Sequence, residues 1–180
     1  MVCGLTKRWM SWVRLPPVAP LFPVHVARDF PFCLPNIFSV DAGLSLSPHL
    51  VRFDGKEARF LEGHEICRLA TASEKAVPHV VPVVYVLDRE KIVIAMDYGT
   101  KKLKNLRENP VASLVVDDYE PNRAVFILGD CQILERGKEY IRLLKLLFNR
   151  FEFYRKNPWG EDESPIIVVT PSKVVSWGLR

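Results

Sequence analysis

The pattern of apolar and polar positions divides the chain near residue 50. Before that point the sequence shows neither a helical period nor strict alternation, and seven of the 14 prolines lie in residues 1–48. Proline fixes φ and has no N–H to donate, so we expect no long regular element there. Residues 1–48 are predicted to be a Pro-rich extension: a disordered or loosely packed segment, a targeting peptide, or the product of a mis-assigned start. The folded domain is expected over 49–180.

Helical spacing of apolar residues recurs three times after residue 50. The predicted helices are 55–68, with Ala58, Leu61 and Ile66 among charges, 100–109, and 137–156, with an apolar stripe of Ile141, Leu144, Phe148 and Phe151. Thr100 is well placed as the N-cap of the second helix, and Asn109-Pro110 ends it.

Apolar runs rich in β-branched residues, bounded by turn residues, predict six or seven strands. The runs are 68–73, 79–88, 91–97, 111–118, 123–134 and 165–178, the last read as two short strands broken at Thr170-Pro171. Pro82 indicates an edge strand, a bulge or a place where a ligand displaces pairing, and Gly129 indicates a bulge or a bend. We therefore expect a mainly β fold: a closed or half-open antiparallel barrel with small flanking helices.

The helix over 100–109 carries an unusual charge at its start. Lys101 and Lys102 fall in its first turn, where the helix dipole already places partial positive charge. An anion would offset this repulsion, and a phosphate could take the Thr100 hydroxyl, the free backbone N–H groups and the lysine charges together. The alternative is a solvated face of a small exposed helix.

Overall charge argues against a nucleic-acid partner. The formal net charge is +4, and residues 1–50 hold four of the 25 basic but only two of the 21 acidic residues, so the remainder is nearly neutral. A single-strand binder would also interleave aromatic residues with its basic ones. The four cysteines form no C-x-x-C pair, which favours free thiols, and no run of about 20 apolar residues is present. We expect a cytoplasmic protein that binds neither nucleic acid nor membrane.

Other chemistry-bearing residues give weaker signals. His64 is expected to be solvated on the outer part of the first helix, and His79 to lie near a possible ligand at the mouth of a strand. Asp117-Asp118 is interpreted as a charged turn. The sequence contains no G-x-S-x-G, Walker A or zinc-ligand spacing.

Several short motifs occur together in a fixed order. They are Arg68-Leu69-Ala70-Thr71, Pro78-His79-Val80-Val81-Pro82-Val83, Gly99-Thr100-Lys101-Lys102, Asn105-Leu106 and Asn109-Pro110. In this order the chain, from about residue 55 to 179, resembles the pyridoxamine 5'-phosphate oxidase-like family of FMN-binding split barrels. The resemblance implies a homodimer with the flavin at the subunit interface.

The resemblance also implies roles for individual residues. The FMN phosphate would be held by Thr100, Lys101 and Lys102, and the isoalloxazine ring would lie beside the strand backbone of Val80, Val81, Pro82 and Val83. The ring or the ribityl chain would contact Ala95, Met96 and Asp97. Arg123 would reach the flavin across the dimer interface, and Trp177 would close the site. Lysine at 101 replaces the commoner arginine, so a bidentate fork becomes a point charge.

One departure bears on the substrate. The R-x-H segment that grips the substrate phosphate in true pyridoxamine phosphate oxidases has no counterpart, because His79 is the last histidine. The resemblance therefore implies an FMN-dependent oxidoreductase that acts on another small substrate. The residues also fit relatives that use a deazaflavin coenzyme in place of FMN or together with it. The alternative is a non-catalytic flavin-binding, flavin-storage or haem-binding protein of the same fold.

Overall fold

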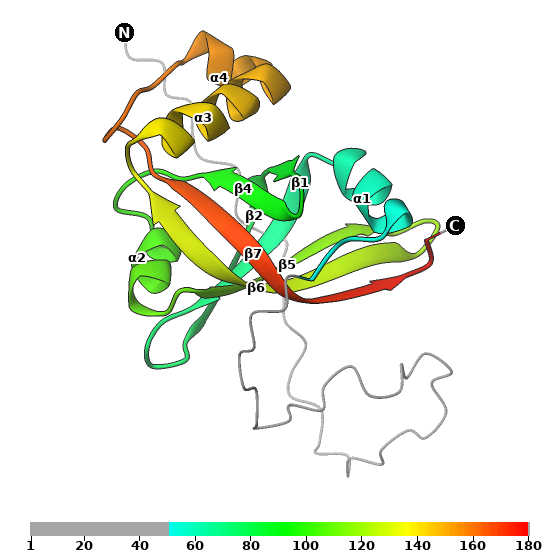
Figure 1. Ribbon diagram of the computed structural model, residues 1–180. Helices are drawn as coiled ribbons and strands as arrows, with labels where there is room; N and C mark the ends of the chain where they lie inside the picture. The colour runs from blue at the N-terminus through cyan, green and yellow to red at the C-terminus, as the bar shows by residue number, and fades with distance from the viewer. Residues whose placement is uncertain (1–50, 180) are drawn as a thin grey trace, which may run out of the picture. The chain divides into compact units, whose positions relative to one another are not determined.

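The computed structural model describes residues 51–179, so the predictions for residues 1–48 lie outside the described part. Residues 51–179 form one sheet of seven strands with four helices (Figure 1). In chain order these are α1 (Gly55–Glu62), β1 (Ile66–Ala72), β2 (Pro78–Val84), β3 (Val86–Asp88), β4 (Lys91–Ala95), α2 (Lys101–Glu108), β5 (Val111–Asp118), β6 (Arg123–Leu134), α3 (Lys138–Arg150), α4 (Glu152–Lys156) and β7 (Ile166–Trp177).

The strands pair in the order β2-β1-β5-β6-β7-β4-β3, and every pair is antiparallel. The sheet curls so that β2 also approaches β4. Helix α3 packs on the outside of β4 and the start of β7, and α4 lies against α3 (Figure 1). The predicted mainly β split barrel is confirmed. So is the edge position indicated by Pro82, since β2 is an edge strand.

The core has two parts because strand side chains alternate between two faces. In β4, Ile92 and Ile94 point into the barrel, whereas Val93 and Ala95 pack toward α3. This explains why the run Lys91–Ala95 is almost entirely apolar: both faces of β4 are covered, one by the barrel core and one by a helix.

The last strand differs from the prediction. The expected break at Thr170-Pro171 is wrong, because β7 runs without interruption over 12 residues. Its register against β6 shifts instead: Leu128 lies opposite Lys173 and Gly129 lies opposite Pro171, so β7 holds one extra residue. The irregularity predicted at Gly129 is confirmed in position, although the extra residue belongs to β7 and not to the strand that carries Gly129. A Cβ at Gly129 would lie 2.5 Å from the Thr170 carbonyl oxygen.

The long helix predicted over 137–156 is two helices. α3 ends at Arg150 and α4 starts at Glu152, with extended backbone at Phe151 between them. In the predicted stripe, Leu144 and Phe151 are buried and Phe148 packs against the core, but Ile141 is wrong, since it is 37% exposed. The buried face of α3 consists of Tyr140, Leu143, Leu144 and Leu147.

Two further boundaries differ from the prediction. The helix expected over 55–68 stops at Glu62, and Ile66 starts β1 with 55% of its surface exposed. The run 79–88 is not one strand but two, because β2 pairs with β1 while β3 pairs with β4. The Asp88-Arg89-Glu90 turn of the predicted hairpin is present between β3 and β4.

Candidate functional site

The first turn of α2 is a cationic helix end without a counter-charge. Thr100 occupies the N-cap position, but its hydroxyl donates to the Asp97 carbonyl oxygen (2.9 Å) and caps no N–H of the helix. No acidic residue lies in the first turn. Among residues 51–179, no carboxylate lies within 4.0 Å of the ammonium groups of Lys101 or Lys102. This end of the helix therefore presents backbone N–H groups and two positive charges together.

Burial and one hydrogen bond fix α2 against the sheet. Leu103 and Leu106 are buried in the barrel core, as the amphipathic pattern predicts. The buried side chain of Asn105 donates from Nδ2 to Thr71 Oγ1 on β1 (3.1 Å). Since Thr71 pairs with His79 on β2, the helix is anchored beside the strand pair that carries the second predicted segment of the site.

That second segment, on β2, alternates between two faces. Val81 and Val83 are half-buried, while Val80 and Pro82 are exposed, Val80 by 59%. Val80 lies opposite Ala70 on β1 and Pro82 lies opposite Arg68, so the outward face of this edge is apolar around Val80 and borders a charged side chain beside Pro82. An apolar edge of this kind can receive a flat ring or another chain.

The third segment follows β4 directly. The Met96 N–H donates to the Pro165 carbonyl (2.9 Å), and Ser164 Oγ donates to the Met96 carbonyl (2.6 Å). Ala95 is half-buried, Met96 is buried and Asp97 is exposed. Because Asp97 precedes Thr100 and its carbonyl accepts the Thr100 hydroxyl, this segment and the start of α2 form one continuous surface.

Arg123 and Trp177 lie elsewhere in the chain. Ala124 pairs with Trp177 at the end of β7, whereas Ala95 pairs with Ile166 at its beginning. The 12 residues of β7 would span about 40 Å at ~3.3 Å per residue if the strand were straight. Within one chain, these two residues are therefore not brought together with Thr100, Lys101 and Lys102.

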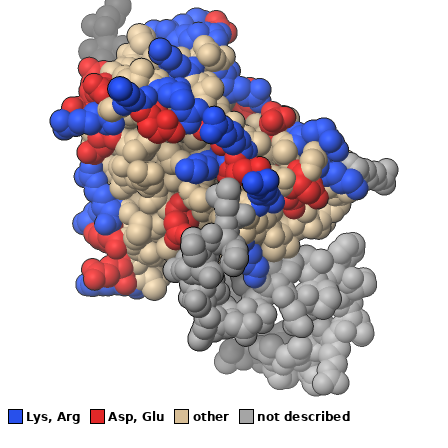
Figure 2. All heavy atoms as spheres, viewed as in Figure 1, with Lys and Arg blue, Asp and Glu red and all other residues tan. Residues whose placement is uncertain are grey.

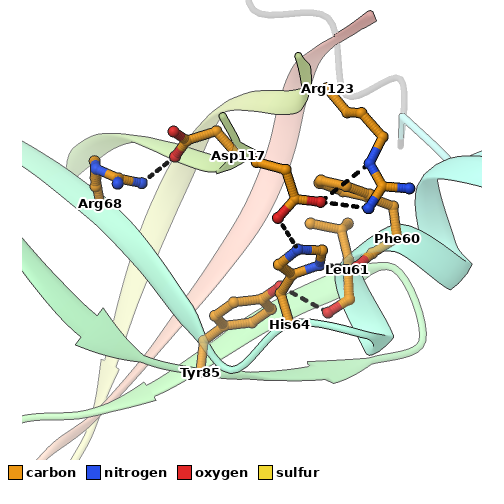
Figure 3. A network of polar contacts seen from close by, with 8 residues as sticks. Phe60, Leu61, His64, Arg68, Tyr85, Asp117 and Arg123 are labelled. Atoms are coloured by element: carbon orange, nitrogen blue, oxygen red, sulfur yellow. Dashed lines mark hydrogen bonds and ion pairs between the residues drawn. The ribbon is translucent and has the colours of Figure 1, made fainter. Parts of the chain in front are cut away.

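Arg123 is already engaged in another contact. Its guanidinium donates from Nε (3.0 Å) and an Nη (2.5 Å) to Asp118 Oδ2, and it lies 5.3 Å from the ring centroid of Phe60 (Figure 3). Trp177 Nε1 donates to Asn122 Oδ1 (3.1 Å). Both residues thus have defined positions at the β6–β7 end of the sheet.

Sequence reasoning missed a polar network at that end. His64 was expected to be solvated, and this is wrong: its Nε2 lies 3.0 Å from Asp118 Oδ1 and its Nδ1 lies 2.7 Å from the Phe60 carbonyl oxygen (Figure 3). The interpretation of Asp117 as part of a turn is also wrong, since Asp117 and Asp118 end β5 and Asp117 pairs with Arg68. The feature that could have indicated this network is the placement of Asp118 opposite Arg123 across the turn between β5 and β6.

Three further observations concern the surface charge, the hydropathy and the metal-ligating residues of the described part. On the face shown in Figure 2, basic and acidic side chains are interspersed and apolar or uncharged surface separates them. Between residues 51 and 179, none of the helices has the length and apolarity to cross a bilayer. In the same range, no group of three or more His, Cys, Asp or Glu is placed to hold a metal ion.

Comparison with known sequences identifies the family. Residues 53–178 match the sequence profile described as Pyridoxamine 5'-phosphate oxidase. The chain is also 31% identical over 137 residues to the 5a,11a-dehydrotetracycline/5a,11a-dehydrooxytetracycline reductase of Streptomyces rimosus subsp. rimosus, an alignment that covers 71% of this chain and 84% of the relative. The chain therefore belongs to the pyridoxamine 5'-phosphate oxidase family.

Solved structures share the fold at low sequence identity. HutZ, the haem storage protein from Vibrio cholerae, superposes with a TM-score of 0.63 at 15% identity, covering 72% of this chain and 97% of that protein. An F420 reductase superposes with a TM-score of 0.51 at 20% identity, covering 65% and 94% respectively. The same barrel thus occurs in proteins named for different ligands.

Proposed function

We propose that this protein is a flavin-dependent reductase that binds FMN at the start of α2 and works as a homodimer. The observation that carries the proposal is the first turn of α2, which has uncapped N–H groups and no acidic residue of its own. Within the described range 51–179, Lys101 and Lys102 also have no carboxylate within 4.0 Å. Without an anion this end of the helix is destabilised by its own charges. A phosphate monoester supplies both the negative charge and the acceptor oxygens that the turn lacks.

The surroundings of this turn fit the rest of FMN. Asp97 and Met96 lead directly into it, and β2, anchored to the same helix through Thr71 and Asn105, presents Val80 and Pro82 outward. Bound flavin would supply hydride or electron transfer. The chain's own contribution is to hold the phosphate, to cover one face of the ring with the apolar β2 edge, and to orient a substrate beside it.

A homodimer would unite the two separated groups of predicted site residues. Arg123 and Trp177 lie at the far end of β7 from Ala95, so they would reach the flavin from the other subunit. The exposed apolar residues of the sheet edge, among them Val80 and Pro82, give the surface that a second copy would cover.

A reductase is favoured over a storage protein by the Streptomyces rimosus relative, whose name describes reduction of a small polycyclic substrate. The proposed reaction class is hydride transfer from reduced flavin to a conjugated small molecule. A deazaflavin such as F420 is the alternative coenzyme, because an F420 reductase shares the fold. Cys67 and Cys131 are free thiols, which fits the reducing cytoplasm where we place the protein.

An absorption spectrum of the purified full chain, before and after addition of FMN, F420 or haem, tests this proposal. Paired near-ultraviolet and blue bands that persist through gel filtration, and that bleach on addition of a nicotinamide donor, are the expected result. A protein that retains haem but neither flavin nor F420 would instead support the storage function that the HutZ-like fold suggests. Flavin retention without reduction by any donor would leave binding without turnover.

A further inference from the structure

A hollow of about 330 Å³ lies between the segment after β4 and the chain around α4. Met96 and Asp97 form one side, Phe153 and Tyr154 of α4 form another, and Trp159, Glu163 and Ser164 come from the connection to β7. This volume is at the lower end of the range of about 300–1,000 Å³ that small-molecule sites occupy. The hollow is therefore large enough for part of an organic ligand.

Three aromatic rings line the hollow at different inclinations. The ring centroids of Phe153 and Tyr154 are 4.0 Å apart with 45° between their planes, and those of Tyr154 and Trp159 are 4.6 Å apart at 83°. Phe153 remains 51% exposed, which is unusual for a phenylalanine beside other rings. Rings set at such angles present both faces and edges to one small volume.

Two carboxylates lie beside these rings without a basic partner. Among residues 51–179, no Lys, Arg or His side chain lies within 4.0 Å of Asp97 or Glu163. Glu163 accepts the Gly160 N–H (2.8 Å), which holds its side chain in place. The hollow thus combines aromatic faces with fixed negative charge.

Three other basic residues form ion pairs with carboxylates that do not line the hollow. Arg107 pairs with Glu135, Arg136 with Asp162, and Lys156 with Glu152. Lys101 and Lys102 belong to the phosphate-binding turn of α2 and make no ion pair with Asp97.

The charge of Asp97 acts on Tyr154, one of the aromatic residues that line the hollow. Burial, and secondarily the charge of Asp97, raise the pKa of the Tyr154 hydroxyl to about 12. The Tyr154 phenol therefore stays neutral, and its ring keeps the electron-rich face that attracts cations.

We propose that this hollow binds the positively charged amine end of an organic ligand, a quaternary or protonated tertiary ammonium group. A cation gains from the ring faces and from the carboxylates at once, whereas an anion would be repelled by Asp97 and Glu163. A neutral apolar group would contact the rings but leave both carboxylates without a partner.

The position of the hollow connects it with the flavin site. Asp97 belongs both to the hollow and to the segment that leads into the phosphate-binding turn. If the proposed function holds, the ammonium group is a handle by which a substrate is oriented beside the flavin. Binding of the cation itself does not depend on flavin.

A pair of isosteric probes tests the charge requirement: choline and its neutral carbon analogue 3,3-dimethylbutan-1-ol. The full chain, labelled with nitrogen-15, is titrated with each probe at constant ionic strength, with and without FMN. The indole N–H signal of Trp159, assigned by its loss in Trp159→Phe, reports on the hollow. We expect a saturable shift with choline and at least about tenfold weaker binding of the neutral analogue, as a cation–π contribution implies.

Substitution of the carboxylates gives the matched comparison. The double variant Asp97→Asn and Glu163→Gln should weaken choline binding about tenfold, and the glutamine can still accept the Gly160 N–H. Glu152→Gln removes a carboxylate of α4 that does not line the hollow, and choline binding should stay unchanged. Equal affinity for both probes, an unchanged double variant, or no saturable Trp159 shift at millimolar choline would overturn the cation site.

The two proposals fail separately in this design. Choline binding in a protein that takes up no flavin would overturn the proposed function and leave the cation site standing. Flavin uptake without choline binding would overturn the cation site and leave the proposed function standing.

Discussion

His64 and Asp118 join the end of α1 to the end of β5, with His64 Nε2 3.0 Å from Asp118 Oδ1. The second ring nitrogen, Nδ1, lies 2.7 Å from the Phe60 carbonyl oxygen, so both nitrogens of the ring have a polar partner. Asp118 also receives Arg123, whose guanidinium lies over the Phe60 ring. One carboxylate therefore links α1, β5 and β6 (Figure 3).

The Asp118 link predicts a pH-dependent contribution to stability. Hydrogen bonds from His64, first, and Arg123, second, hold the pKa of Asp118 below its ordinary value of 3.8. Its contribution is therefore fully present above pH 3.8 and is lost as pH falls through the lower folded-state pKa. Asp118→Asn should lower the urea midpoint at neutral pH, and the difference from wild type should shrink below pH 3.8. Asp130→Asn, at an exposed position, is the control. A difference for Asp118→Asn that is independent of pH would contradict the assignment.

The phosphate-binding role of α2 predicts a loss of FMN affinity in Lys101→Ala/Lys102→Ala. Charge-assisted hydrogen bonds are worth about 1.5–3 kcal/mol each, so the double variant should bind FMN a few kcal/mol more weakly. Lys104→Ala removes a charge from the second turn of the same helix and should change affinity little. Fluorescence titration of FMN measures all three proteins. Equal FMN affinity in the double variant and the wild-type protein would contradict the assignment of the phosphate to this turn.

The bond between Asn105 and Thr71 predicts a cost when its acceptor is removed. Asn105 is fully buried, and its Oδ1 already lacks a partner among the described residues. Thr71→Val preserves shape but leaves Nδ2 unpaired as well, which should destabilise the fold by about 1–3 kcal/mol. Thr71→Ser keeps the hydroxyl and should cost less. Chemical denaturation of the two variants separates the lost hydrogen bond from the lost methyl group.

The bulge in β7 predicts that Gly129 cannot accept a side chain. An alanine Cβ would lie 2.5 Å from Thr170 O and 2.9 Å from a Val169 methyl carbon. Relief of the backbone contact requires the two strands to separate, so Gly129→Ala should cost about 1–3 kcal/mol, as overpacking does. Gly55→Ala, at the start of α1, meets only the end of the Arg59 side chain and should be neutral or slightly stabilising. Thermal denaturation that ranks the two variants in the opposite order would contradict this reasoning.

The proposed dimer predicts that a charge on the outer face of β2 separates the subunits. Val80 is 59% exposed, and Val80→Asp would bury a carboxylate if a second copy covered it. Sedimentation velocity should show a dimer for wild type and a monomer for the variant. Ile141→Asp, on α3 and 37% exposed, should remain a dimer. A monomeric wild-type protein, or a Val80→Asp variant that stays dimeric, would exclude this face as the interface.

Local pattern predicted those elements whose form depends on nearby residues. The turn at Asp88-Arg89-Glu90, the helix α2 and the strand β5 follow from alternation, capping position and breakers close in sequence. The break at Tyr85 could not be predicted in this way, because the apolar run 79–88 is continuous. The chain changes there from pairing with β1 to pairing with β4, and the Tyr85 hydroxyl bonds to Leu61 O (2.7 Å) from α1.

The same limit applies to the site. Thr100, Lys101 and Lys102 could be found because their charge conflicts with the dipole of their own helix, which is a local signal. His64 could not, because its partner Asp118 is distant in sequence and becomes a neighbour only when α1 meets β5. The proposed grouping of Arg123 and Trp177 with the lysines would require a second chain, and no pattern within one sequence specifies that.

The position of β7 has a consequence for how the chain is made. Of the described strands it is synthesised last, yet it is the one that joins β4 to β6. Until it leaves the ribosome, β4 pairs only with the three residues of β3, and the far edge of β6 stays open. The sheet can therefore close between β4 and β6 only after β7 has left the ribosome.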